Sequence, residues 1–210
     1  MTDINTARDA LDKLREGNRR FVEGQTRGSD LAGDARRRET AGGQAPFAVI
    51  LGCSDSRVPA EIVFDQGLGD LFVIRVAGNV VAPSQVGSVE FAVEMFGSSL
   101  VVVLGHTSCG AIDATLDQLG RESAMRSANL AAIVDRVRPG IEPILKQTPA
   151  LEGEALRRAA MRANVAASVD GLLAGSEILR DAVKDSRLLI VGAEYDLESG
   201  RVAFLETPIS

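Results

Sequence analysis

The sequence predicts an α/β fold with a short, mainly parallel sheet, helices on both faces, an antiparallel edge strand and an N-terminal helical arm. Three observations lead to this fold class. Short apolar runs without polar alternation recur along the chain, as expected for strands covered on both faces. Helical stretches separate these runs, and strand–helix alternation is typical of a parallel sheet. The last apolar run follows a polar turn at 198–200, which favours an antiparallel pair.

Length and composition fit one soluble globular domain. The chain has 210 residues, of which 45% are hydrophobic and 25% are charged, enough apolar material for a sizeable core. We therefore expect a single domain over residues 1–210, with a helical arm over 1–45 and an α/β core over 46–210.

The arm begins with a helix predicted over Thr6–Glu23, where apolar side chains recur on one face among charged ones. The apolar positions are Ala7, Leu11, Leu14 and Phe21. A polar, glycine-rich loop follows over Gln25–Asp34, and a second short helix is predicted over Ala35–Ala41. Because a single short helix is marginal alone, we expect the apolar face to need a covering surface and the arm to serve assembly.

The core is expected to alternate strands and helices. The predicted strands are Phe47–Leu51, Asp70–Ile74, Leu100–Leu104, Leu188–Val191 and Arg201–Leu205. The predicted helices are Pro59–Phe64, Ser84–Met95, Ala111–Leu119, Ala128–Lys146, Glu154–Gly171 and Glu177–Val183.

Charge and hydropathy exclude several classes of partner. The net charge of −6 argues against nucleic acid or an anionic membrane as the main partner, because both require a basic surface. No stretch of about 18 uncharged apolar residues predicts a membrane span. The first five residues lack the basic patch and apolar run of a secretory signal, so we expect a cytoplasmic location.

The chain has two cysteines and one histidine, and all three fall near predicted strand ends. Cys53 lies two residues after the first apolar run, and His106 lies two residues after the third, with Cys109 close behind. Ligands of open parallel sheets bind beyond the carboxyl ends of the strands. Zinc takes thiolate, imidazole and carboxylate ligands in a tetrahedron, so these three side chains and Asp55 predict a zinc site.

Other chemistry explains these residues less well. A lone cysteine is more often a small buried hydrophobe, and a lone histidine is often a structural residue, but here they occur together. A thiol phosphatase needs an arginine where this chain has Pro59, and residues 52–56 do not form a serine-hydrolase elbow. A nucleophile pair of Cys53 with His106 as base stays possible, although it leaves Cys109 unexplained.

Three ordered motifs resemble the β-class carbonic anhydrases of the bacterial type. They are Gly52–Pro59, with the pattern Cys-Ser-Asp-Ser-Arg, Gly67–Asn79, and Gly105–Gly110, with the pattern His-x-x-Cys-Gly. The resemblance is dense over about residues 46–115 and weaker elsewhere. It implies the fold class given above, an arm wrapped on a partner subunit, and a homodimer or homotetramer.

The resemblance also implies one Zn²⁺ per chain, held by Cys53, His106 and Cys109. Asp55 then has two possible states. It ligates zinc and closes the site, or it pairs with Arg57 and leaves the fourth position to water, which is the active state. An arginine fork holds a carboxylate with two hydrogen bonds, so Arg57 competes with zinc for Asp55. Asp55 and Arg57 are thus the expected catalytic residues.

Further expectations concern substrate binding and inhibition. Gln66 and Gly110 are expected to contact substrate, although for Gln66 the register differs by one residue and a plain turn role is equally open. One subgroup of the family has an inhibitory bicarbonate site built from Trp, Arg and Tyr. Here Ile50 stands at the tryptophan position, while Arg75 and Tyr195 resemble the other two, so that site is incomplete.

The function implied by the resemblance is the reversible, zinc-dependent hydration of carbon dioxide to bicarbonate and a proton, which makes the protein a lyase. Two alternatives stay open at this point. One is hydrolysis of carbonyl sulfide or carbon disulfide on the same scaffold, and the other is a non-catalytic zinc protein with a closed four-ligand site.

Overall fold

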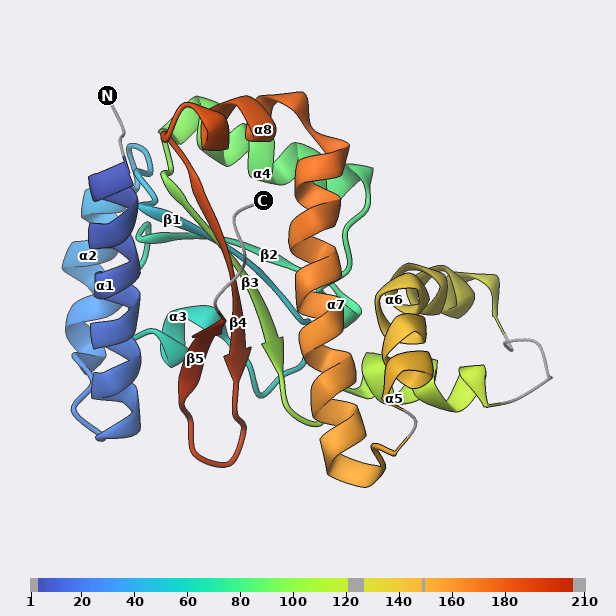
Figure 1. Ribbon diagram of the computed structural model, residues 1–210. Helices are drawn as coiled ribbons and strands as arrows, with labels where there is room; N and C mark the ends of the chain where they lie inside the picture. The colour runs from blue at the N-terminus through green and yellow to red at the C-terminus, as the bar shows by residue number, and fades with distance from the viewer. Residues whose placement is uncertain (1–3, 121–126, 149, 206–210) are drawn as a thin grey trace.

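The computed structural model describes residues 4–120, 127–148 and 150–205. Its centre is a five-stranded sheet with the strand order β2-β1-β3-β4-β5 (Figure 1). The strands are β1 Ala48–Gly52, β2 Leu71–Arg75, β3 Leu100–His106, β4 Leu189–Tyr195 and β5 Val202–Leu205. The first four run parallel and β5 pairs antiparallel with β4, which confirms the predicted mainly parallel sheet with an antiparallel edge strand.

Eight α-helices flank this sheet within the described ranges. They are α1 Ile4–Val22, α2 Asp34–Thr40, α3 Ala60–Val63, α4 Pro83–Phe96, α5 Gly110–Leu119, α6 Ala128–Gln147, α7 Gly153–Gly175 and α8 Glu177–Lys184. Each lies within a few residues of its predicted position. Two short 3₁₀ turns, Gly28–Leu31 and Ala77–Asn79, were not predicted, and the first lies inside the expected loop.

The two faces of the sheet carry separate hydrophobic cores. One core packs the sheet against α4 to α8, and the other packs it against α1 and α3 (Figure 1). Glycines allow the close approach of α7 to the sheet. A Cβ at Gly105 would stand 2.5 Å from Val165 Cγ2, and one at Gly192 would stand 2.7 Å from Val165 Cγ1. A methyl group at either position would therefore push the helix away from β3 and β4.

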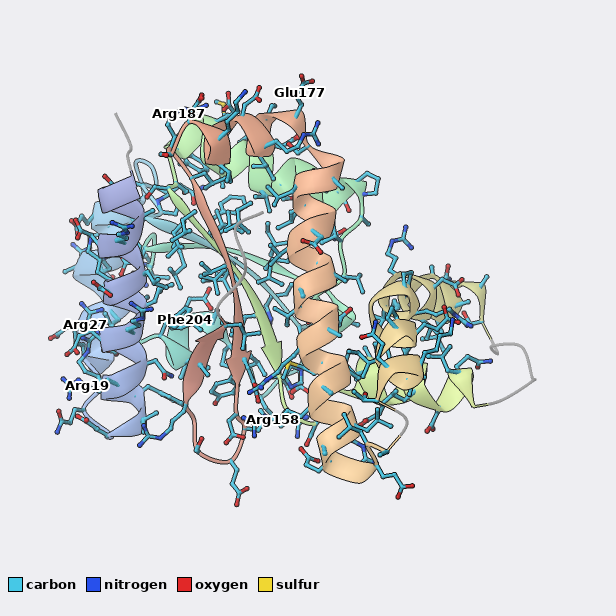
Figure 2. All side chains as sticks on the ribbon, in the orientation of Figure 1. Arg19, Arg27, Arg158, Glu177, Arg187 and Phe204 are labelled. Atoms are coloured by element: carbon cyan, nitrogen blue, oxygen red, sulfur yellow. The ribbon has the colours of Figure 1, made fainter. Side chains whose placement is uncertain are left out.

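The N-terminal arm lies against the sheet of its own chain. Ala7 and Leu14 of α1 are fully buried and Leu11 is 8% exposed, within the core that includes α3 and the strands. The predicted need for a covering surface is therefore met by the chain's own sheet. The role of the arm in assembly stays a prediction from sequence. Arg19 extends from the outer side of the arm (Figure 2), whereas the guanidinium of Arg27 donates to the Asp65 carbonyl at 2.5 Å.

The third and fourth strands are longer than predicted. His106 is the last residue of β3 instead of lying beyond it, because β4 continues alongside and pairs His106 with Tyr195. The ladder extends one bond further, from Thr107 N–H to the Tyr195 carbonyl at 3.0 Å. No helix in the described part of the chain is long and apolar enough to cross a membrane.

Candidate metal centre

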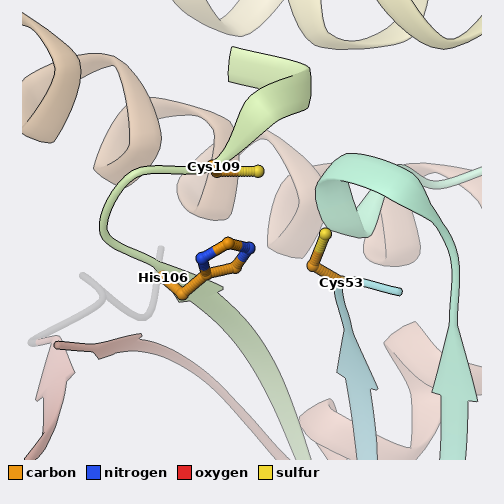
Figure 3. A group of neighbouring side chains, drawn as sticks. All are labelled: Cys53, His106 and Cys109. Atoms are coloured by element: carbon orange, nitrogen blue, oxygen red, sulfur yellow. The ribbon is translucent and has the colours of Figure 1, made fainter. Parts of the chain in front are cut away.

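Cys53, His106 and Cys109 converge at the carboxyl end of the sheet (Figure 3). One nitrogen or sulfur atom from each lies within 4.8 Å of the others. All three residues are buried, with 6% of Cys53, none of His106 and 4% of Cys109 exposed. The sequence prediction that these three side chains form one group is therefore correct in its geometry.

Local backbone structure explains the convergence. The neighbouring parallel strands β1 and β3 pair Gly52 with Leu104, so Cys53 and His106 emerge from the same edge of the sheet. The chain then turns through Ser108, whose φ of 54° lies in the left-handed region. This turn brings Cys109 back as the residue preceding α5, directly above the imidazole.

The ring of His106 is oriented for a metal ion. Its Nδ1 lies 2.9 Å from the Thr107 carbonyl, which only accepts hydrogen bonds, so Nδ1 carries the proton. Nε2 is then the atom with a free lone pair. It is buried and finds no hydrogen-bond partner among the described residues. A buried, unpartnered acceptor beside two cysteine sulfurs fits a metal ligand better than a structural histidine.

Backbone N–H groups favour negative charge on both sulfurs. Gly78 N–H donates to Cys53 Sγ at 3.4 Å, and Cys109 Sγ accepts from Ala111 and Ile112 at the start of α5. A hydrogen bond from the Cys109 thiol lowers the pKa of Cys53 to about 4. Sharing that proton raises the pKa of Cys109. One imidazole and two cysteine sulfurs that accept backbone N–H groups form a donor set that suits zinc.

The imidazole lies in a negative environment. Burial opposes its protonation, but the neighbouring Cys53 sulfur and the Thr107 carbonyl raise the pKa of His106 above its usual value. A positive charge is thus stabilised at this point of the structure, as expected where a cation binds.

Asp55 lies beside the group and is held by Arg57. The arginine donates from Nε to Oδ1 at 2.9 Å and from Nη2 to Oδ2 at 2.7 Å, and its backbone N–H adds a third bond. These bonds keep the pKa of Asp55 well below its usual range. Asp55 Oδ2 remains 4.0 Å from His106 Nε2. Of the two states expected for Asp55, this structure has the one paired with Arg57.

The two predicted substrate residues lie in different places. Gly110 directly follows Cys109, and a Cβ added there would meet nothing within 4 Å, so open space adjoins it. Gln66 is not brought to the group within the chain. Its amide donates to the Phe64 carbonyl at 2.7 Å, and it lines a pocket with Phe47 and Asp70, which precede β1 and β2 at the opposite edge of the sheet.

Arg75 supports the loop that carries the site. Its guanidinium donates to the Cys53 carbonyl at 3.1 Å and to the Asp55 carbonyl at 2.6 Å. Ile50 is fully buried in β1, and burial raises the pKa of Tyr195. The supporting role of Arg75 and the hydrogen bond from Gly78 were not predicted. Both residues belong to the motif 67–79, which the sequence pointed to only by the resemblance, with Arg75 matched to the incomplete inhibitory site.

Comparisons with known proteins agree with this geometry. The family model described as carbonic anhydrase matches residues 48–202. Carbonic anhydrase 2 of Mycobacterium tuberculosis is 40% identical over 188 residues, covering 90% of this chain and 87% of that protein. The carbonic anhydrase of Mycolicibacterium smegmatis is 41% identical over 195 residues, with 90% and 88% covered.

Solved structures show the same fold. A Coccomyxa β-carbonic anhydrase in complex with acetazolamide has a TM-score of 0.74 at 26% identity, covering 95% of this chain and 87% of that one. A β-carbonic anhydrase of Aspergillus fumigatus has a TM-score of 0.73 at 26% identity, with 94% and 89% covered. From its sequence motifs, its sheet and these matches, the chain belongs to the β-class carbonic anhydrase family.

Proposed function

We propose that this chain is an enzyme that hydrates carbon dioxide reversibly to bicarbonate and a proton, with one zinc ion per chain. The observation that carries the proposal is the hydrogen-bonded pair of Asp55 and Arg57. It holds the carboxylate 4.0 Å from His106 Nε2 and leaves three donors instead of four. A catalytic zinc site keeps three protein ligands and one open position, whereas a structural site is closed.

Cys53, His106 and Cys109 would hold the metal. Bound there, zinc would supply a Lewis acid that lets water ionise near neutral pH. Asp55 would accept a hydrogen bond from the attacking water and orient it toward the substrate. Arg57 would keep Asp55 ionised and away from the three donors. Gly110 would leave room for substrate at the start of α5, while the substrate role of Gln66 stays a prediction from sequence.

The metal assignment is tested by removing each donor. Cys53→Ser, His106→Ala and Cys109→Ser should each lose zinc, because neighbouring side chains cannot rebuild the ligand set. Elemental analysis of purified protein measures this, with about one zinc per wild-type chain expected. Ser98→Ala serves as a control, since that buried hydroxyl bonds to the Pro46 carbonyl at the far edge of the sheet. Full zinc occupancy in all three variants would remove the assignment.

The reaction is tested by stopped-flow hydration of carbon dioxide on the zinc-loaded wild type. The proposal requires turnover that all three ligand variants lose. Zinc binding without hydration at any pH would instead favour one of two alternatives, a hydrolase of carbonyl sulfide or carbon disulfide, or a non-catalytic zinc protein. Assay with those two sulfur compounds separates the alternatives.

A homo-oligomer, dimer or tetramer, is also part of the proposal. Ile62 and Leu68 are 59% and 42% exposed, and both line a pocket of about 380 Å³ beside the arm. Large apolar side chains that gather around a pocket are typical of a surface that a second protein covers. Light scattering of the full chain measures this, and a monomer at micromolar concentration would contradict it. The cytoplasmic location stays a prediction from sequence.

A further inference from the structure

The turn Ala77–Asn79 lies against the candidate metal centre and has an unusual backbone. Gly78 and Asn79 have φ angles of 72° and 45°, so two successive residues lie in the left-handed region. Asparagine tolerates this region better than most residues, but two successive left-handed residues persist only where the surrounding structure holds them. The N–H of Gly78 is the group that donates to Cys53 Sγ. The position of this donor therefore depends on what holds the turn.

Two side chains of α7 hold it. Asn164 Nδ2 donates to the Gly78 carbonyl at 2.8 Å, and Ser168 Oγ donates to the Asn79 carbonyl at 3.1 Å. Asn79 Nδ2 returns a longer bond to Ser168 Oγ at 3.5 Å. Asn79 and Asn164 are each 2% exposed and Ser168 is 4% exposed. Low dielectric strengthens such buried bonds and makes their loss costly.

The helix that carries these two side chains is itself fixed to the sheet. Glu194 of β4 is 1% exposed and forms ion pairs at 2.6 Å with Arg158 and with Arg162, both of which come from α7. Asn164 lies half a turn beyond Arg162, so its amide projects from an anchored part of the helix. The hydrogen bond from Asn164 to Gly78 therefore comes from a helix that two ion pairs fix to β4.

The turn also packs beside the residues that follow Cys109. A Cβ at Gly78 would lie 2.9 Å from the Ala111 side chain, so only glycine allows this approach. Ala111 is one of the two residues whose N–H groups bond to Cys109 Sγ. The turn thus supplies the N–H donor to Cys53 Sγ and packs against a residue that supplies a donor to Cys109 Sγ.

We propose that Asn164 and Ser168 are positioning residues that fix the Gly78 N–H on Cys53 Sγ and thereby strengthen and tune metal binding. This inference rests on the proposed zinc site. An N–H group that donates to a thiolate withdraws charge from sulfur and orients its lone pairs. Such outer-shell partners set both the affinity and the electronic character of a metal centre.

The experiment compares two buried serines, Ser168 within α7 and Ser176 directly after its last residue. Ser168→Ala removes the hydroxyl that bonds to Asn79. Ser176→Ala is the matched control, because Ser176 is also buried, at 2% exposed, and its hydroxyl bonds to Glu90 at 2.5 Å, away from the metal centre. Asn164→Ala is the stronger variant. If it fails to fold by circular dichroism, Ser168→Ala still decides the question.

Two measurements on each full-length variant separate positioning from folding. Zinc affinity, by competition with a chelator, should weaken about tenfold in Ser168→Ala and up to about a hundredfold in Asn164→Ala. With Co²⁺ in place of zinc, the thiolate-to-cobalt absorption band should move to longer wavelength in both, because an unbonded thiolate is a better electron donor. Ser176→Ala should match wild type in both measurements even if its melting temperature falls.

Wild-type affinity and an unmoved cobalt band in Ser168→Ala would overturn this inference while leaving the proposed function intact. A wild type that binds neither zinc nor cobalt would overturn both. Equal losses in Ser168→Ala and Ser176→Ala would also overturn the inference, since they would reflect general destabilisation.

Discussion

Among the aspartates that pair with arginines, Asp55 and Asp65 differ sharply in burial and in the segments that their pairs join. Asp55 and Arg57 are two residues apart in one loop, with side chains 17% and 54% exposed. Asp65 is 1% exposed and binds Arg20 at 2.5 Å and the Arg27 backbone N–H at 3.0 Å, both from the N-terminal arm. One pair lies at the candidate metal centre, while the other joins distant segments.

The two pairs show that the same kind of ion pair can have a different role when it is buried. Water competes for the half-exposed Arg57, so its bond to Asp55 exchanges at little cost, as a switch requires. Asp65 has lost its water and depends on its arginine partners, so breaking that pair leaves a buried charge without compensation. We therefore expect the first pair to control activity and the second to control stability.

The largest expected effect is on stability. Asp65→Asn keeps the size of the side chain, and asparagine tolerates the φ of 47° at this position. Loss of the charge should lower the free energy of unfolding by about 3 kcal/mol, measured by urea denaturation. Activity per folded molecule should not change. Asp55→Asn is the matched substitution and should cost less than about 1 kcal/mol. Equal destabilisation by both would abolish the distinction.

Arg57→Ala should have the reverse profile. Without its partner, Asp55 is free to occupy the fourth metal position, so zinc content should stay at about one per chain. The kcat/KM for carbon dioxide hydration should fall by about a hundredfold, the scale seen when reacting groups are misplaced. The melting temperature should remain near that of wild type. Near wild-type turnover would show that the pair does not act as a switch.

Arg57→Lys should give an intermediate result. Lysine keeps the positive charge but replaces the two-bond fork with a single point of contact. Loss of one charged hydrogen bond should reduce kcat/KM about tenfold, measured with the same stopped-flow assay. A value equal to that of Arg57→Ala would mean that the fork geometry, not the charge, holds Asp55.

The smallest effect concerns acid. Burial alone would raise the pKa of Asp65, but Arg20 and Arg27 lower it below its usual value. A depressed pKa in the folded state adds stability above the unfolded pKa of about 4, and that stability is lost as pH falls through the folded value. The stability difference between wild type and Asp65→Asn should therefore be constant from pH 7 to 5 and shrink below about pH 4. An unchanged difference at pH 3 would contradict this.

Much of the fold followed from the sequence because its apolar runs carry their own geometry. Continuous runs over 47–51 and 100–104 predict buried strands, and the rule for parallel sheets then places Cys53 and His106 at the carboxyl edge. These features depend on residues close together in the chain.

Other features required the packed structure. The sequence left both states of Asp55 open, and the hydrogen bonds from Arg57 decided between them. It left Gln66 open between a substrate contact and a turn residue, and the structure places that side chain toward the opposite edge of the sheet within the chain. It also left open which surface covers α1, and the structure shows that the sheet of the same chain buries Leu14.

The sequence by itself determined the succession of strands and helices along the chain, the family and the three donor residues, because local patterns and short motifs encode them. The tertiary structure alone decided which polar groups face one another. Asn164 and Ser168 are ordinary polar positions in a helical stretch, and only the approach of α7 to the turn after β2 makes them partners of Gly78 and Asn79. A hydrogen bond depends on distances of a few tenths of an ångström between segments far apart in the chain, and packing fixes those distances.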